Sequence, residues 1–182
     1  AMLAGSRPPA QYPEAGPTQR VSVVLASREV AEVIRTRIAN LLSTRFPLDR
    51  LEIIVAIDAR DSHATPEELT GFSDNVRVII GDAPGGKAMG VNAAMRQATG
   101  DVVVFADSFQ SFTPDTIPRL AGALQAPNTG AVSGRLVLAK AEDRVSPIHL
   151  YWGYETWLRE CEARWHSCVG VFGPVNAIRR EL

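Results

Sequence analysis

Short runs of apolar residues, separated by amphipathic stretches, organise this chain from residue 21 onward. The runs cover residues 21–26, 51–57, 76–80 and 102–106. Each run is rich in β-branched side chains and is apolar at successive positions, which is typical of strands covered on both faces. The pattern therefore predicts the buried strands of a parallel sheet.

Helical spacing of apolar residues fills the stretches between these strands. The first stretch predicts an amphipathic helix through Val30, Ile34, Ile38, Leu41 and Leu42. This helix is expected to end before Pro47, because a residue that precedes proline avoids the helical region. The sequence Thr65-Pro66-Glu67-Glu68 predicts another helix start, with a capping residue, proline at the first helical position and acids in the first turn.

Two further helices and one aromatic segment follow. A helix over residues 86–98 and another beginning at Thr113 are predicted, with buried faces formed by Val91, Ala94, Met95 and Ala98 and by Ile117, Leu120 and Leu124. Residues 149–166 carry Leu150, Tyr154, Trp157, Leu158, Cys161 and Trp165 on one helical face. Packing of this face on the core is the favoured interpretation, and an aromatic face that receives a sugar or docks on a membrane stays open.

Strands that alternate with helices predict an α/β fold built on a doubly wound sheet. In such sheets, ligands gather at the carboxyl ends of the strands. The residues that follow the four predicted strands are polar or rich in glycine, namely Ser27-Arg28-Glu29, Asp58, residues 81–87 and Asp107-Ser108. Their convergence at one edge of the sheet predicts a ligand that carries phosphate.

Length and charge fit one soluble domain without a nucleic-acid partner. The chain has 182 residues, with 19 basic and 20 acidic side chains and a formal net charge of −1, so it has no basic footprint. No apolar run is long enough to span a bilayer and no signal peptide is visible, so we expect a cytoplasmic location. Residues 1–20 predict a flexible lead-in, and residues 21–182 one domain.

The glycines before Lys87 favour phosphate binding. Glycine lets a backbone approach a phosphate, and a lysine at a helix start adds positive charge. A turn followed by a solvated lysine is the competing interpretation. Read from Gly81, the segment also fits a P-loop, although Ala88 stands where a metal-binding hydroxyl is needed. For Asp58, binding of a base or ribose and a plain surface turn stay equally open.

Asp107 is the candidate metal ligand. A carboxylate after a strand can hold Mg²⁺ or Mn²⁺ against a diphosphate, but Phe109 stands where a second acid is needed. A cap of the next turn is the competing role for Asp107. Cys161 and Cys168 lie seven positions apart without a Cys/His cluster, which favours reduced thiols over a zinc site.

Seven segments, taken in order, resemble the family-2 glycosyltransferases of the GT-A fold, particularly the bacterial cellulose-synthase-like group. They are residues 21–29, 51–58, 86–94, 100–107, 130–134, 151–158 and 173–182. The resemblance implies a Rossmann-like, mostly parallel sheet with helices on both faces. It also implies transfer of a sugar from a nucleoside diphosphate sugar, with UDP favoured, to a saccharide or lipid-linked acceptor, usually with Mg²⁺ or Mn²⁺.

The resemblance carries site residues over to this sequence. The nucleotide-binding residues implied are Ala26, Ser27, Glu29, Asp58, Gly86, Lys87, Asp107 and Ser108. Asp107 would also hold the metal, and Gly173 and Pro174 would border the sugar or acceptor.

The sequence departs from the family pattern at several of these positions. Ala26 replaces a proline, Arg60 puts bulk and positive charge at the pocket mouth, and Phe109 removes the second motif acid. The family's catalytic aspartate would follow Leu182, so no catalytic residue is assigned and the isolated chain is expected to be inactive.

Three functional hypotheses follow. The first is the donor-binding part of a glycosyltransferase for polysaccharide or glycolipid synthesis, whose parent protein could be attached at the cytoplasmic face of the inner membrane. The second is a non-catalytic binding or scaffold module of the same fold, and the third is a P-loop-like nucleotide-binding protein. Self-association through an exposed sheet edge is a further expectation.

Overall fold

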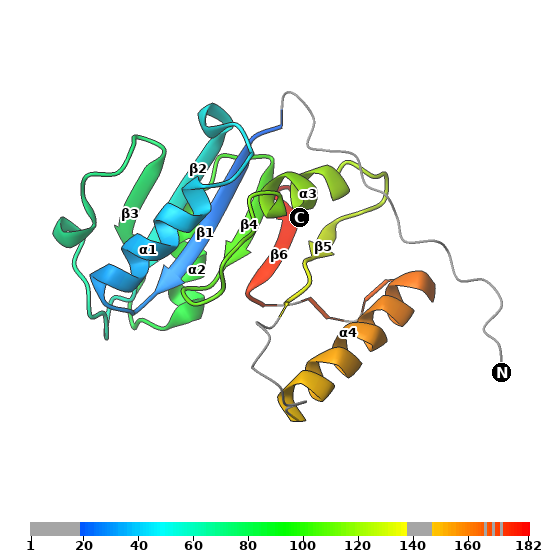
Figure 1. Cartoon of the computed structure of the whole chain (residues 1–182). Coiled ribbons are helices and arrows are strands. Elements are labelled where there is room, and N and C mark those ends of the chain that lie inside the picture. The colour runs from blue at the N-terminus through cyan, green and yellow to red at the C-terminus, as the bar shows by residue number, and fades with distance from the viewer. Residues whose placement is uncertain (1–18, 138–146, 166, 169, 172) are drawn as a thin grey trace.

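The computed structural model describes residues 19–137, 147–165, 167–168, 170–171 and 173–182 (Figure 1). Its elements, in chain order, are β1 (Val21–Ser27), α1 (Ala31–Leu42), β2 (Leu51–Ile57), β3 (Val76–Ile80), α2 (Lys87–Gln97), β4 (Val102–Ala106), α3 (Thr116–Ala123), β5 (Ala131–Ser133), α4 (Pro147–Trp165) and β6 (Val175–Arg179). Single 3-10 turns at Leu48–Arg50 and Glu67–Leu69 precede β2 and β3. The predicted lead-in lies, up to residue 18, outside the described residues.

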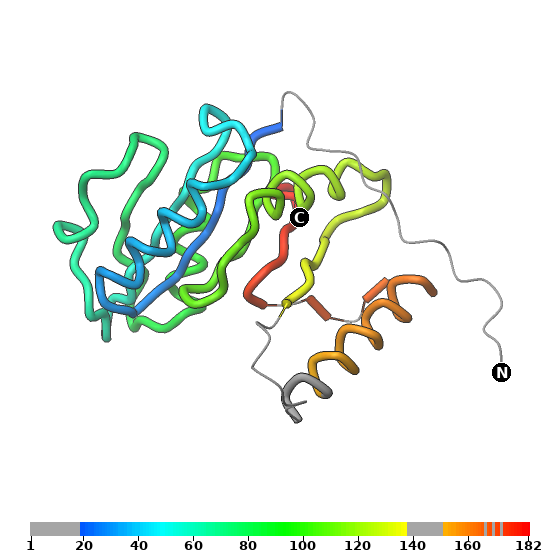
Figure 2. Tube along the Cα trace, in the orientation of Figure 1, coloured from blue at the N-terminus to red at the C-terminus, as the bar shows by residue number. Residues whose placement is uncertain are grey.

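The strands form one six-stranded sheet in the order β3-β2-β1-β4-β6-β5. The first four strands in this order run parallel, and Val21 of β1 pairs with Leu51 on one side and with Val102 on the other. β6 is antiparallel to both β4 and β5, so the last strand returns between two earlier segments (Figure 2). The predicted mostly parallel, doubly wound sheet is confirmed.

Helices cover both faces of the sheet, as predicted. α1 and α3 pack on one face, where Ile34 and Leu120 join alternate strand residues such as Val23 in one apolar cluster. α2 packs on the other face, where Ala94 joins Ile54 in a smaller cluster. The alternation of strand side chains between the two faces explains why the strands are apolar at successive positions.

At the helix start predicted from Thr65, only the 3-10 turn Glu67–Leu69 forms. The predicted cap by Thr65 is wrong, because Pro66 holds the N-cap position and no side chain caps the turn, although the Thr65 N–H donates to Glu68 Oε2 at 2.8 Å. The turn ends at Thr70, whose backbone is extended, and Gly71 follows with a φ of 86°. The Glu68 carbonyl accepts a hydrogen bond from Arg35 Nε at 2.9 Å instead of serving a further helical turn.

The aromatic helix α4 lies beyond the β5 and β6 edge of the sheet (Figure 1). The favoured prediction that its aromatic face packs on the core is wrong, because Tyr154, Trp157 and Trp165 are 57%, 58% and 84% exposed. Trp152 packs against the core instead. Helical spacing shows which residues share a face, but it does not show whether another element covers that face.

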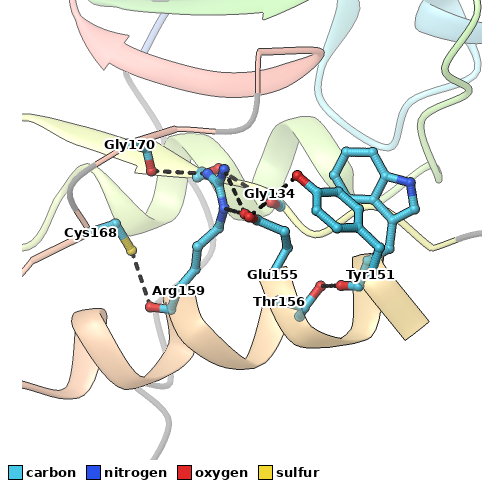
Figure 3. A network of polar contacts seen from close by, with 9 residues as sticks. Gly134, Tyr151, Glu155, Thr156, Arg159, Cys168 and Gly170 are labelled. Carbon is cyan, nitrogen blue, oxygen red and sulfur yellow. Dashed lines mark hydrogen bonds and ion pairs between the residues drawn. The ribbon is translucent and has the colours of Figure 1, made fainter. Parts of the chain in front are cut away.

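Polar contacts tie α4 to the segment that follows it (Figure 3). Arg159 forms an ion pair with Glu155 at 3.4 Å and donates to the Gly170 carbonyl at 3.1 Å. The Cys168 thiol donates to the Arg159 carbonyl at 3.4 Å. Across the described ranges, neither this helix nor another is long and apolar enough to cross a bilayer.

A half-buried acid lies at the amino-terminal end of the parallel strands. Glu52 of β2 accepts hydrogen bonds from Ser22 Oγ at 2.5 Å and from the Thr99 N–H at 2.6 Å, and it forms an ion pair with Arg77. Burial is the largest single influence and raises the pKa of Glu52, but the bonds from Ser22 and Thr99 and the Arg77 charge together lower it below its ordinary value. Glu52 therefore joins β1, β3 and the loop before β4 through one carboxylate.

Candidate functional site

A cavity of about 380 Å³ opens at the carboxyl ends of β1, β2 and β4. All eight residues predicted for nucleotide binding line it: Ala26, Ser27, Glu29, Asp58, Gly86, Lys87, Asp107 and Ser108. They come from the ends of β1, β2 and β4 and from the start of α2. Because β1 to β4 run parallel, their carboxyl ends lie at one edge of the sheet. The sequence reasoning therefore selected residues that the fold brings together.

Asp58 organises one wall of this cavity. Its Oδ1 accepts hydrogen bonds from the N–H groups of Arg60 at 2.8 Å and Asp61 at 3.2 Å, and its Oδ2 accepts from the Gly86 N–H at 2.7 Å. The Arg60 amide is the largest influence and lowers the pKa of Asp58, burial opposes it, and the Gly86 and Asp61 amides and the Arg60 charge lower the pKa further. Asp58 is therefore a carboxylate at neutral pH that fixes the start of α2 against the end of β2.

The glycine loop before α2 is shaped by this carboxylate. Gly85 and Gly86 have φ values of 92° and 98°, in the left-handed region that favours glycine. A Cβ on Gly85 would lie 2.6 Å from Asp58 Oδ1, so this position excludes other side chains. The Gly85 N–H donates to the Asp82 carbonyl at 2.9 Å. Because the amides of both glycines already have acceptors in the protein, the loop does not present the row of free N–H groups that a P-loop needs.

Lys87 and Asp107 form an ion pair in the wall of the cavity. Lys87 is the first residue of α2, and its Nζ forms an ion pair with Asp107 Oδ1. The Lys87 side chain is 61% exposed and the Asp107 side chain 26% exposed. Beside this pair, Ser108 Oγ donates to Ser27 Oγ at 2.9 Å, which links the ends of β4 and β1.

The cavity also has cationic side chains at its mouth. Arg28 and Arg60 line it together with Asp61, and Arg28 lies 4.0 Å from the Asp61 carboxylate. Arg60, which the sequence predicts at the pocket mouth, is exposed and lines the cavity.

Sequence reasoning missed Arg37 of α1. This side chain is only 3% exposed, its Nε donates to the Asp107 backbone carbonyl at 2.8 Å, and its guanidinium lies 4.2 Å above the Phe112 ring. Burial is the main cause that lowers the pKa of Arg37, to about 10, while the Asp107 charge acts in the other direction. The sequence signal that could have identified Arg37 is its position on the apolar helical face that contains Ile34 and Ile38.

Asn40, one turn after Arg37, completes a clamp on the loop of residues 107–112. Its Oδ1 accepts a hydrogen bond from the Phe112 N–H at 2.9 Å, and its Nδ2 donates to the Phe112 carbonyl at 3.0 Å. Arg37 also donates to Asn40 Oδ1. Through these two side chains, α1 holds both ends of the loop that carries Asp107 and Ser108 into the cavity.

Gly173 and Pro174, predicted for the sugar or acceptor, do not line the cavity. They precede β6, whose first residue Val175 pairs with Ala106 at the end of β4. They therefore lie at the same edge of the sheet as the cavity but outside its wall. The Gly173 carbonyl accepts a hydrogen bond from Asn176 at 2.9 Å.

The residues present fit a divalent cation poorly. Asp107 is already paired with Lys87, and Phe109, two residues later, is 70% exposed and brings no oxygen donor. The described part of the chain contains no group of three or more His, Cys, Asp or Glu side chains that could hold a metal ion. Mg²⁺ and Mn²⁺ prefer several hard oxygen ligands, and the acids that line the cavity, Glu29, Asp58, Asp61 and Asp107, do not form such a group.

Known proteins of similar sequence are glycosyltransferases by name. The chain is 28% identical to a probable glycosyltransferase, YdaM, of Bacillus subtilis over 90% of its own length and 41% of that protein. It is 24% identical to an N-acetylglucosaminyltransferase of Rhizobium leguminosarum over 96% of its length and 42% of that protein. The chain thus spans less than half the length of these relatives.

A solved structure and a family model agree with the sequence relatives. The fold matches a mannosyltransferase from Pyrobaculum calidifontis, in complex with GDP-Man and Mn²⁺, with a TM-score of 0.71 at 24% identity over 96% of this chain and 49% of that one. The family model described as glycosyl transferase family 2 matches residues 22–181. The chain therefore belongs to glycosyltransferase family 2.

Proposed function

We propose that this chain binds a nucleoside diphosphate sugar, with a UDP-sugar as donor, in the cavity at the carboxyl edge of the sheet. The observation that carries the proposal is the gathering of eight polar or small residues from four separate segments around one cavity. The names of the relatives support a hexose donor, since one is an N-acetylglucosaminyltransferase and the structural neighbour holds GDP-Man.

The two ends of the cavity suit the two ends of a nucleoside diphosphate. Asp58 remains ionised and has lone pairs that can accept hydrogen bonds from a base or ribose. Lys87 stands at the start of α2, where a helix favours negative charge, and this is where we propose the diphosphate. The sugar would then extend toward the edge near Gly173 and Pro174, next to the site of a saccharide or lipid-linked acceptor.

We propose that transfer requires groups beyond those of this cavity. Direct transfer to an acceptor hydroxyl needs a base, such as a carboxylate, that takes the proton of this hydroxyl. Asp58 is engaged by three backbone amides and Asp107 by Lys87, so neither is free to act as that base. Sugar transfer, polysaccharide or glycolipid synthesis and membrane attachment are accordingly proposals about the whole protein.

Calorimetric titration with UDP, GDP and ATP tests the binding proposal. We expect UDP to bind and Asp58→Asn to weaken it by roughly tenfold, because a charged acceptor is lost. Asp49→Asn is the matched control, since this exposed acid lies before the opposite end of β2 and should leave affinity unchanged. Thermal unfolding of both variants separates a binding defect from a folding defect.

The other outcomes discriminate the alternatives. Binding of ATP in preference to UDP would revive the P-loop hypothesis. The absence of binding by all three nucleotides would sink the donor-binding proposal. That result would favour a non-catalytic scaffold module, for which the exposed Phe109 in place of an acid is the supporting observation.

A further inference from the structure

We propose that the Lys87 ammonium, and not a divalent cation, bridges Asp107 to the diphosphate of the bound donor, so that binding is independent of metal. This inference rests on the proposed function, because it concerns how that same ligand is neutralised. It arises from the poor fit between the residues of the cavity and a metal ion.

The ammonium already occupies the position that a bridging cation would need. Lys87 Nζ forms an ion pair with Asp107 Oδ1, and Asp107 is the acid that ends β4 at the cavity. A divalent ion that bound Asp107 would have to displace this ammonium or sit beside it, and like charges at short range repel. Phe109 offers no oxygen that could compensate.

Lys87 has capacity left for a phosphate. An ammonium carries three N–H donors, and the ion pair with Asp107 uses one direction of approach. The Lys87 side chain is 61% exposed and lines the cavity, so its remaining donors can reach a ligand there. One ammonium can therefore hold a carboxylate on one side and a phosphate oxygen on the other.

The surroundings of Lys87 also favour an anion. Lys87 begins an eleven-residue helix whose first turn contains no acid. Arg60 lines the same cavity and adds a second cation. The Gly86 amide is held by Asp58, whereas the Lys87 side chain is long and exposed enough to move toward a ligand. Lys87 and Arg60 thus place positive charge in a cavity that Glu29, Asp58, Asp61 and Asp107 also line.

Calorimetry with UDP and with uridine, in EDTA and in MnCl₂, tests this inference. For the unmodified chain we expect the UDP dissociation constants in the two buffers to agree within about threefold. Lys87→Met should weaken UDP binding by roughly ten- to a hundredfold, because a charge-assisted contact to phosphate is lost. It should leave uridine binding unchanged, whereas a damaged fold would weaken both ligands.

Two further variants complete the design. Arg119→Met removes a positive charge from an exposed position on α3 and should leave UDP binding unchanged, which controls for net charge. Phe109→Asp adds the missing acid at an exposed position, and we expect UDP binding by this variant to become tighter in MnCl₂ than in EDTA.

The outcomes separate the two proposals. Two results would overturn the bridging role of Lys87 and leave donor binding intact. One is UDP binding by the unmodified chain that requires MnCl₂, and the other is UDP binding by Lys87→Met that is as tight as in the unmodified chain. Failure of UDP to bind in both buffers would overturn donor binding itself.

Discussion

The two ends of β2 carry acids that the fold uses in different ways. Glu52, near the amino-terminal end, receives side-chain bonds from Ser22 and Arg77 and bonds from Thr99, and its side chain is only 18% exposed. Asp58, just past the carboxyl end, is bonded by the backbone amides of a loop and a helix start and lines the cavity.

The difference shows how one strand can serve both stability and binding. At Glu52 the partners are other parts of the sheet, so the carboxylate ties neighbouring strands together and keeps little surface for a ligand. At Asp58 the partners are backbone N–H groups, which shape a loop while the carboxylate stays at the cavity wall. A strand-end acid is therefore a site candidate at the carboxyl edge, where parallel strands open toward a ligand.

The largest expected effect is the loss of stability in Glu52→Ala. This change leaves the Thr99 N–H without its acceptor, removes the bond from Ser22, and takes the carboxylate partner from Arg77, which keeps its bond to the Gln97 carbonyl. We expect the free energy of unfolding to fall by about 3 kcal/mol, the usual cost when one partner of a partly buried charged network is removed. Urea denaturation followed by circular dichroism measures this loss.

At the carboxyl end of β2, the comparison predicts a large effect on nucleotide affinity and a small effect on stability. Asp58→Asn should reduce nucleotide affinity much more than it reduces stability, and Glu52→Ala should do the reverse if the folded fraction is kept high by low temperature. A Glu52→Ala protein that is fully stable, or one that stays folded and has lost nucleotide binding, would break the distinction between the two acids.

The sequence supported this distinction only in part. The predicted bounds of β2, β3 and β4 are confirmed, because β-branched runs bounded by polar residues leave few alternatives. Asp58, Lys87 and Asp107 could be selected because strand order and direction bring these ends together. Their hydrogen bonds could not be predicted, because they depend on the path of the loop through Gly85 and Gly86.

Other features depend on contacts that no local pattern encodes. Trp157 sits on a helical face that looks suited to a core, but no described element covers it and it is 58% exposed. Arg37 lies on an apolar helical face, where a charge is unexpected from the sequence. Its partners are the Asp107 carbonyl and the Phe112 ring. In both cases the deciding partner is remote in sequence.

A smaller effect is expected from Arg37→Met, which extends the comparison to the end of β4. Methionine keeps much of the volume and removes the hydrogen bond to the Asp107 carbonyl. We expect a stability loss of about 2 kcal/mol at most, because the desolvation cost of the buried guanidinium is relieved at the same time. UDP affinity should fall severalfold as the loop moves. Unchanged affinity in a destabilised protein would show that the clamp does not position Asp107.

The smallest effect is a difference in how stability depends on pH between the unmodified chain and Glu52→Gln. The pKa of Glu52 is lowered in the folded state, because the bonds from Ser22 and Thr99 and the Arg77 charge outweigh the effect of burial. The unfolded chain therefore binds this proton more readily, so the stabilisation by Glu52 is present above the ordinary glutamate pKa and is lost as the pH falls through the lowered one.

The pKa of Asp58 is lowered too and acts in the same direction in both proteins, so only the difference between them reports on Glu52. Between about pH 6 and pH 3, the free energy of unfolding should fall more steeply for the unmodified chain than for Glu52→Gln. Parallel curves would mean that the Glu52 contacts do not favour its charged form, and the half-buried acid near the amino-terminal end of β2 would then need another explanation.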